Sequence, residues 1–193
     1  AIQVPIKLAN PTDYYASNQT IIFLQGLYLG LLLIMALFNI FLFIALKEKM
    51  YLFFSTLLFS YFAFHIGLNG LGFQYLWPSF ETINLKWIPF SLAGFSLSCC
   101  FFMQEFLQLK ENKGHYHQML KVFTLLVAIG TFASIFLSYS YSVQMFTYAA
   151  LPLSAFAIWV SARLLFQGLQ VARFFLWAWL VFIAFGVILS LSK

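Results

Sequence analysis

The stretch GLYLGLLLIMALFNIFLFIALKEKMYLFF, residues Gly26 to Phe54, decides the fold class. Its first part is an apolar run that ends at the charged residues Lys47, Glu48 and Lys49, after which the apolar character resumes. A helix that crosses the hydrocarbon core of a bilayer needs about 20 consecutive apolar residues. The stretch therefore predicts one transmembrane helix, a short charged turn and the beginning of a second transmembrane helix.

The composition of the whole chain indicates the same environment. Of the 193 residues, 63% are hydrophobic, 21% aromatic and 8% charged, whereas a soluble domain has about 25% charged residues. Mean hydropathy is +0.92. The net charge of +5 comes from a few residues that stand between apolar runs. We interpret this charge as a topology signal, with the lipid bilayer as the partner and no nucleic acid.

Six apolar runs are long enough to cross a bilayer, so the predicted fold class is all-α, a polytopic bundle of transmembrane helices. The short linkers between these runs favour antiparallel neighbours. The predicted spans are Ile21–Leu46, Tyr51–Tyr75, Trp87–Leu109, Met119–Leu137, Val143–Phe166 and Phe174–Leu191.

The distribution of basic residues predicts the orientation. With the N-terminus outside, seven of the ten Lys and Arg lie at cytoplasmic ends and three lie outside. The seven are Lys47, Lys49, Lys110, Lys113, Lys121, Arg163 and Arg173, and the three are Lys7, Lys86 and Lys193. The positive-inside rule favours this arrangement. Six spans return the C-terminus to the outside, so a cytoplasmic output requires one more helix.

The second span ends in the stretch LNGLGFQYLWP, Leu68 to Pro78. Its aromatic residues suit the interfacial belt of a membrane protein. Gly70 and Gly72 permit a break in the helix or a close approach, and Pro78 prevents the helix from continuing. The composition of this stretch therefore predicts the outer exit of the second helix.

This exit and the preceding Gly26–Phe54 run resemble the membrane module of bacterial seven-transmembrane receptors with diverse intracellular signalling modules. The stretch VARFFLWAW, Val171 to Trp179, looks like the start of the sixth helix in that family. The resemblance covers nearly the whole chain from Tyr15 onwards.

The resemblance implies a signal-transduction receptor module in the bacterial inner (cytoplasmic) membrane. Family members carry a periplasmic sensor domain before the first span and a cytoplasmic output, such as a diguanylate cyclase or histidine kinase, after the seventh. Residues 1–20 are then expected to be a periplasmic juxtamembrane segment, the tail of the sensor domain. Residues 21–193 are expected to be the receptor module, truncated before its seventh helix. The alternative is a small-solute transporter or a subunit of a membrane complex, because the glycine-rich exit and Pro152 weakly resemble the broken helices of transporters.

Five residues near this exit are candidates for ligand binding or signal relay. His65 and Asn69 lie four residues apart, hence on one face of the second helix. An ionisable group at membrane depth is often functional, but a neutral histidine that hydrogen-bonds a neighbouring helix is the competing interpretation. Gln74, Tyr75 and Trp77 complete the set, with plain helix termination as the alternative.

Four residues are candidates for helix packing. Gly26 and Gly30 form a GxxxG pattern that permits close helix approach, either within this bundle or in a homodimer. Asn39 is expected to bond across helices. Pro152 lies inside the fifth span and is expected to kink it, as a shape feature or as a hinge.

The sequence predicts no catalytic site, no metal site and no cofactor. Asp13 is the only aspartate, which excludes a paired-aspartate intramembrane protease, and no G-x-S-x-G, P-loop or HExxH motif occurs. His65 has no second intramembrane histidine with which to hold a haem or a metal. Cys99 and Cys100 are adjacent inside an apolar run, where cysteine commonly acts as a small hydrophobe.

Overall fold

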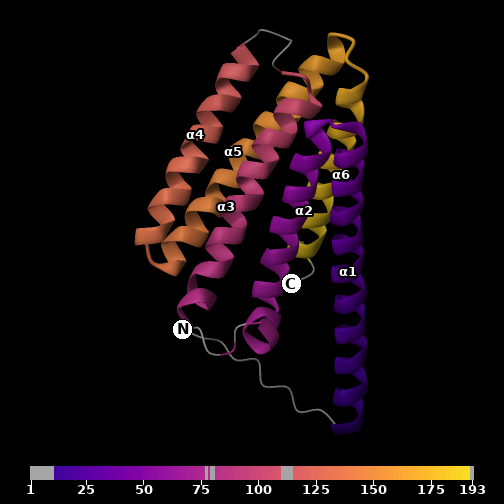
Figure 1. Cartoon of the computed structure of the whole chain (residues 1–193), viewed down its shortest axis with the longest axis vertical. Coiled ribbons are helices and arrows are strands. Elements are labelled where there is room, and N and C mark those ends of the chain that lie inside the picture. The colour runs from indigo at the N-terminus through magenta and orange to yellow at the C-terminus, as the bar shows by residue number, and fades with distance from the viewer. Residues whose placement is uncertain (1–10, 77, 79–80, 110–114, 192–193) are drawn as a thin grey trace.

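The fold is a bundle of helices that alternate in direction (Figure 1). The computed structural model describes residues 11–76, 78, 81–109 and 115–191, and within these ranges it contains helices and no strand. This result confirms the predicted all-α class. The elements are α1 (Pro11–Leu46), α2 (Lys49–Leu68), the π-helical turn η1 (Gly72–Leu76), α3 (Glu81–Phe106), α4 (His115–Phe136), α5 (Tyr139–Phe166) and α6 (Val171–Leu191).

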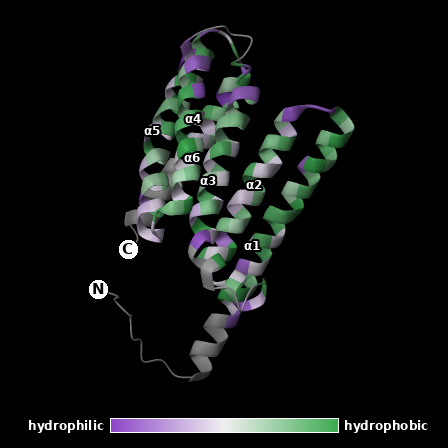
Figure 2. Ribbon diagram, turned by 60° about the vertical axis from the view of Figure 1, so that its left-hand side comes forward, coloured by the Kyte–Doolittle hydropathy of each residue, from purple (hydrophilic) through white to green (hydrophobic). Residues whose placement is uncertain are grey.

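The helices have the length and composition of membrane spans. Five qualify by both criteria, namely Gln19–Leu46 of α1, α2, Lys86–Phe106 of α3, α4 and α5. The side chains of α6 are described as far as Val181, and this part is also apolar. Figure 2 shows that hydrophilic residues gather at the helix ends, while the helix bodies are mostly hydrophobic. The chain is a multi-pass membrane protein.

The end of the second span differs from the prediction. The second span was expected to reach Tyr75, but α2 ends at Leu68 because Gly70 adopts a left-handed φ of 69°, a conformation that glycine tolerates without steric cost. The third span was expected to begin at Trp87, and the part of α3 that qualifies as a span begins at Lys86, although the helix itself begins at Glu81. Pro89 lies inside α3.

The helix α3 is the centre of the bundle. It packs against α2, α4 and α5, whereas α1 packs on α2, and α6 packs on α5. The largest buried cluster lies between α3, α4, α5 and α6, and fully buried leucines such as Leu107, Leu120 and Leu164 belong to it. The α1–α2 hairpin is thus joined to the remaining helices chiefly through the α2–α3 contact.

The helix α1 is longer than a bilayer requires. Its 36 residues correspond to a length of about 54 Å, against a hydrocarbon thickness of about 30 Å. It begins with Pro11, a residue favoured at the first helical position because its fixed φ suits the helix. The helix therefore continues, without a break, beyond the part that qualifies as a span.

Candidate functional site

His65 lies among aromatic rings where α1, α2 and α3 meet. Its imidazole centroid is 5.2 Å from the ring of Tyr28, 4.7 Å from that of Tyr61 and 5.9 Å from that of Phe64, each in an edge-on geometry. Tyr61 also contacts Phe95 of α3, with 5.7 Å between ring centroids. We call these five residues the His65 cluster. It joins three helices through ring contacts in the last turns of α2.

The other relay candidates lie apart from His65. Asn69 is the C-cap of α2, where its backbone N–H donates to the His65 carbonyl at 3.0 Å. Its side chain is exposed, as are those of Gln74 and Tyr75 in η1. Trp77 lies outside the described residues. Asn69 therefore stands at the very end of the helical face that it was expected to share with His65.

Two of the predicted packing residues take part in contacts within the chain. Asn39 is buried, and its amide donates to the Met35 carbonyl at 2.8 Å, one turn earlier in α1. That bond stays within one helix, whereas the prediction was a bond across helices. The helix α5 continues through Pro152, which lines a cavity of about 220 Å³ between α4 and α5.

Gly26 and Gly30 do not support close helix approach in this chain. A Cβ added at either glycine would meet nothing within 4 Å. The predicted contact with another helix of the same bundle is therefore not made at these two positions. A contact with another chain stays a prediction.

Gly67 and Gly94 permit close packing of helices, and the sequence analysis did not single them out. A Cβ at Gly67 would lie 2.7 Å from Cδ1 of Trp87, and one at Gly94 would lie 2.8 Å from Oγ of Ser60. The indole Nε1 of Trp87 also donates to the carbonyl of Ala63 at 2.7 Å. Small residues at helix interfaces let two backbones approach closely. These contacts fix α3 against α2 beside the His65 cluster.

Lys86 caps the C-terminal end of α4. Its Nζ donates to the carbonyls of Ser134 and Ile135 at 3.1 Å each and to that of Leu137 at 2.6 Å. The last carbonyls of a helix lack partners within the helix, and a cation near them is favourable. The lysine therefore ties α3 to the turn between α4 and α5.

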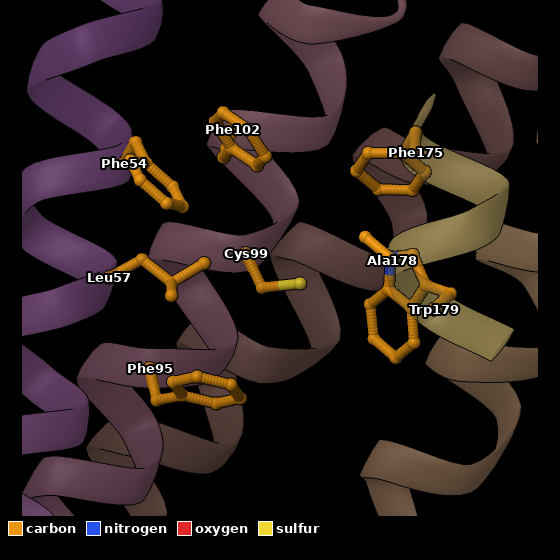
Figure 3. A pocket seen from close by; sticks show the side chains of 8 residues that line it. All are labelled: Phe54, Leu57, Phe95, Cys99, Phe102, Phe175, Ala178 and Trp179. Carbon is orange, nitrogen blue, oxygen red and sulfur yellow. The ribbon is translucent and has the colours of Figure 1, made fainter. Parts of the chain in front are cut away.

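A mainly apolar cavity of about 260 Å³ lies between α2, α3 and α6. Figure 3 shows side chains from all three helices around it. The lining includes Leu57 and Phe54 of α2, Phe95, Cys99 and Phe102 of α3, and Phe175, Ala178 and Trp179 of α6. Phe95 belongs to both the cavity and the His65 cluster, so the two features are adjacent.

Polar chemistry is sparse in the part of the chain that the structure describes. No group of three His, Cys, Asp or Glu side chains there could hold a metal ion. Two buried polar atoms in that part, Nδ1 of His117 and Oγ of Ser142, have no hydrogen-bond partner. They belong to the first turns of α4 and α5, at opposite ends of the bundle, and so form no common site.

Comparison with known proteins gives the family. A family model described as "7TM diverse intracellular signalling" matches residues 21–193. The chain belongs to this family. The 7TM diverse intracellular signalling assignment agrees with the resemblance carried by the Leu68–Pro78 exit, and it makes the chain a signalling receptor module. No curated protein and no solved structure matches the chain.

Proposed function

We propose that the chain is the membrane relay of a bacterial inner-membrane receptor, carrying a signal from a periplasmic sensor domain to a cytoplasmic signalling domain of the same protein. The family match over residues 21–193 is the observation that carries this proposal. In the relay, residues 1–20 connect to the sensor domain and residues 21–193 form the receptor module.

The helix α1 is the proposed input element. It is continuous from Pro11 to Leu46, so a rotation or axial shift imposed at its outer end reaches the membrane-spanning part. Buried residues of α1 at spacings of three and four form one stripe, namely Leu29, Leu32, Ala36 and Asn39. This spacing places them on one face of a helix. The buried Ser55 of α2 donates to the Ala36 carbonyl at 2.8 Å, which links the two helices along this stripe.

The α2–α3 contact is the proposed path onward. The ring contact of Tyr61 with Phe95 and the close approach of Gly67 to Trp87 give this path short, specific contacts. Small helix shifts at such interfaces are a known way to change the spacing or register of attached domains. The proposed signal is therefore a shift of the α1–α2 hairpin against α3.

The test is to insert alanines into α1, between Asn18 and Gln19, in the complete receptor. Each inserted residue turns the outer part by about 100° and lengthens the helix by about 1.5 Å. We expect the output activity to vary with the number of alanines, from one to four, with the period of a helical turn. Activity measured in membranes with and without the sensor stimulus reads this out.

Glycine insertions at the same place are the matched control, because glycine disfavours the helical conformation. They should abolish the periodic response while adding the same chain length. Output that follows neither insertion series would contradict the proposal. Uptake of a small solute by liposomes that contain the receptor would instead support the transporter alternative.

A further inference from the structure

A groove of about 460 Å³ runs along α3 between α2 and α4. The broadly packed pairs among the described residues include α2 with α3 and α3 with α4, but α2 with α4 is not among them, so α3 forms the floor of the groove (Figure 1). Most of the lining residues of α3 recur at spacings of three and four, which places them along one helical face. They are Trp87, Phe90, Ser91, Gly94 and Leu97.

The groove has the length and the lining that suit an acyl chain. From Trp87 to Leu97 it follows about 15 Å of α3, which is half of the hydrocarbon thickness of about 30 Å. The lining is mainly apolar, and the hydroxyls of Ser91 and Thr131 in it already donate to carbonyls one turn earlier, at 2.8 Å each. Phe90, whose ring borders the groove, is 60% exposed. The groove is therefore accessible to a hydrocarbon chain from the bilayer.

A cation lies at the end of the groove where α3 begins. Two further cavities, of about 290 and 330 Å³, adjoin the groove at Phe90, and both are lined by Lys86. The side chain of Lys86 is exposed, and each hydrogen bond of its Nζ among the described residues goes to a carbonyl near the end of α4. The C-terminal end of a helix carries about half of an elementary negative charge. Part of the positive charge of Lys86 is therefore left to attract an anion.

We propose that the groove between α2, α3 and α4 binds one acyl chain of an anionic phospholipid, whose phosphate lies at Lys86. The groove accounts for the chain, and the lysine, which binds phosphate as a point charge, accounts for the headgroup. Lys86 is followed by Trp87, and tryptophan is enriched at the level of lipid headgroups. Trp87 also packs closely against Gly67. A lipid in the groove therefore contacts a side chain that fixes α3 against α2.

Photoactivatable lipids test this site in the complete receptor, reconstituted in phosphatidylcholine vesicles. One sample contains a trace of phosphatidylglycerol with a diazirine on one acyl chain, and the other contains phosphatidylcholine with the same chain. After irradiation and proteolysis, mass spectrometry measures the lipid attached to the groove-lining peptide of α3. We expect about two- to fivefold more labelling by the anionic lipid, because one lysine near a membrane surface contributes about fivefold in affinity and the end of α4 offsets part of its charge.

Substitutions test the headgroup and the chain separately. Lys86→Gln keeps a donor for the carbonyls but removes the charge, so the preference for the anionic lipid should disappear. Ala63→Phe on α2 and Thr131→Phe on α4 fill the groove and should reduce labelling of α3 by both lipids. The matched controls are Lys121→Gln, the same change in charge near the other end of α4, and Ala128→Phe, the same ring at an exposed position of α4. Both controls should leave the labelling unchanged.

Three outcomes would overturn the proposal. Equal labelling by the two lipids would remove the headgroup preference, and labelling that survives both groove-filling substitutions would place the chain elsewhere. Displacement of the photoactivatable lipid by oleate at a lower concentration than by unlabelled phosphatidylglycerol would identify a fatty acid as the occupant. Thermal stability of every variant identifies any substitution that disturbs folding, and the two groove-filling positions on different helices guard against that case. Labelling is read out without the signalling output, so the lipid site and the relay function can fail separately.

Discussion

The imidazole of His65 contacts the rings of Tyr28, Tyr61 and Phe64. Because these contacts depend on a ring at position 65, single substitutions can test the role of the residue. We expect His65→Phe to keep the stability of the receptor, because a phenyl ring can retain the contacts with Tyr28 and Tyr61. His65→Leu removes those ring contacts and should lower the free energy of unfolding by about 1 kcal/mol. Thermal unfolding in detergent measures the stability of both variants. Output activity shows whether the balance between signalling states changes together with stability.

His65→Gln separates the two interpretations of this residue. Glutamine keeps a donor and an acceptor but has no ring, so on the ring interpretation it should behave like leucine. If glutamine preserved stability and phenylalanine did not, hydrogen bonding across helices would be the correct account of His65.

Gly67 carries the second residue-scale prediction. Gly67→Ala places a methyl group 2.7 Å from Trp87 and 3.0 Å from Ile88, so we expect a loss of about 1–3 kcal/mol in unfolding free energy. Gly26→Ala is the matched control, because nothing lies within 4 Å of the added carbon. Equal thermal stability of the two variants would show that α2 and α3 do not need the close approach.

The glycines show which helix contacts can be predicted from the sequence and which cannot. The spacing of Gly26 and Gly30 is visible in the sequence, but whether that face meets another helix depends on the tertiary arrangement. Gly67 and Gly94 belong to different helices and approach Trp87 and Ser60 across the α2–α3 interface. A pattern within one helix cannot indicate such a pair. The only local signal was a small residue inside each apolar run.

At the scale of elements, Lys86 joins the start of α3 to the end of α4. We expect Lys86→Met to lower the unfolding free energy by about 1 kcal/mol, since it removes a charged donor from three terminal carbonyls of the α4 region. Lys121→Met, the same change in charge near the other end of α4, is the control and should have a smaller effect. Chemical or thermal unfolding of both variants gives the comparison, and a smaller loss for Lys86→Met than for Lys121→Met would count against the cap.

The presence of each helix could be predicted from the sequence more reliably than the residues at which the helix begins and ends. Each apolar run yielded a helix because bilayer thickness sets the length of a span, and the charged turn at Lys47–Lys49 marked a true boundary. The end of α2 was predicted too late, at Tyr75, because most of the residues that follow it, such as Phe73, Tyr75 and Leu76, are also apolar or aromatic. The backbone conformation of Gly70, which no hydropathy pattern encodes, moves the boundary to Leu68.

For the whole molecule, the charge distribution predicts the orientation in the membrane. A single cysteine introduced at Gln170, in a background without Cys99 and Cys100, should react with an impermeant reagent only from the cytoplasmic side. One introduced at Gln74 should react only from the periplasmic side, because the two exposed residues lie at opposite ends of the bundle. Labelling of intact cells and of inverted vesicles measures both. The reverse pattern would place the N-terminus in the cytoplasm.

The sequence predicts the all-α class of the bundle better than it predicts which helices pack against one another. Apolar runs indicate how many helices there are but give little information on which faces meet, because lipid-facing and helix-facing residues are similarly apolar. The central position of α3 and its contact with α5 depend on buried residues such as Met103, Val160 and Leu164. These residues look no different in sequence from their exposed neighbours.

The packing of α2 on α1, of α3 on α2 and of α4 on α3 has a consequence for biosynthesis. Each of these helices can associate with its predecessor as soon as it leaves the translocation channel, without waiting for later parts of the chain. The contact between α3 and α5 is different, since the face of α3 that packs on α5 must remain open while α4 is being made. A nascent chain paused after α4 would present that face to membrane chaperones and proteases, so synthesis of α5 is the step at which the helices are committed to one bundle.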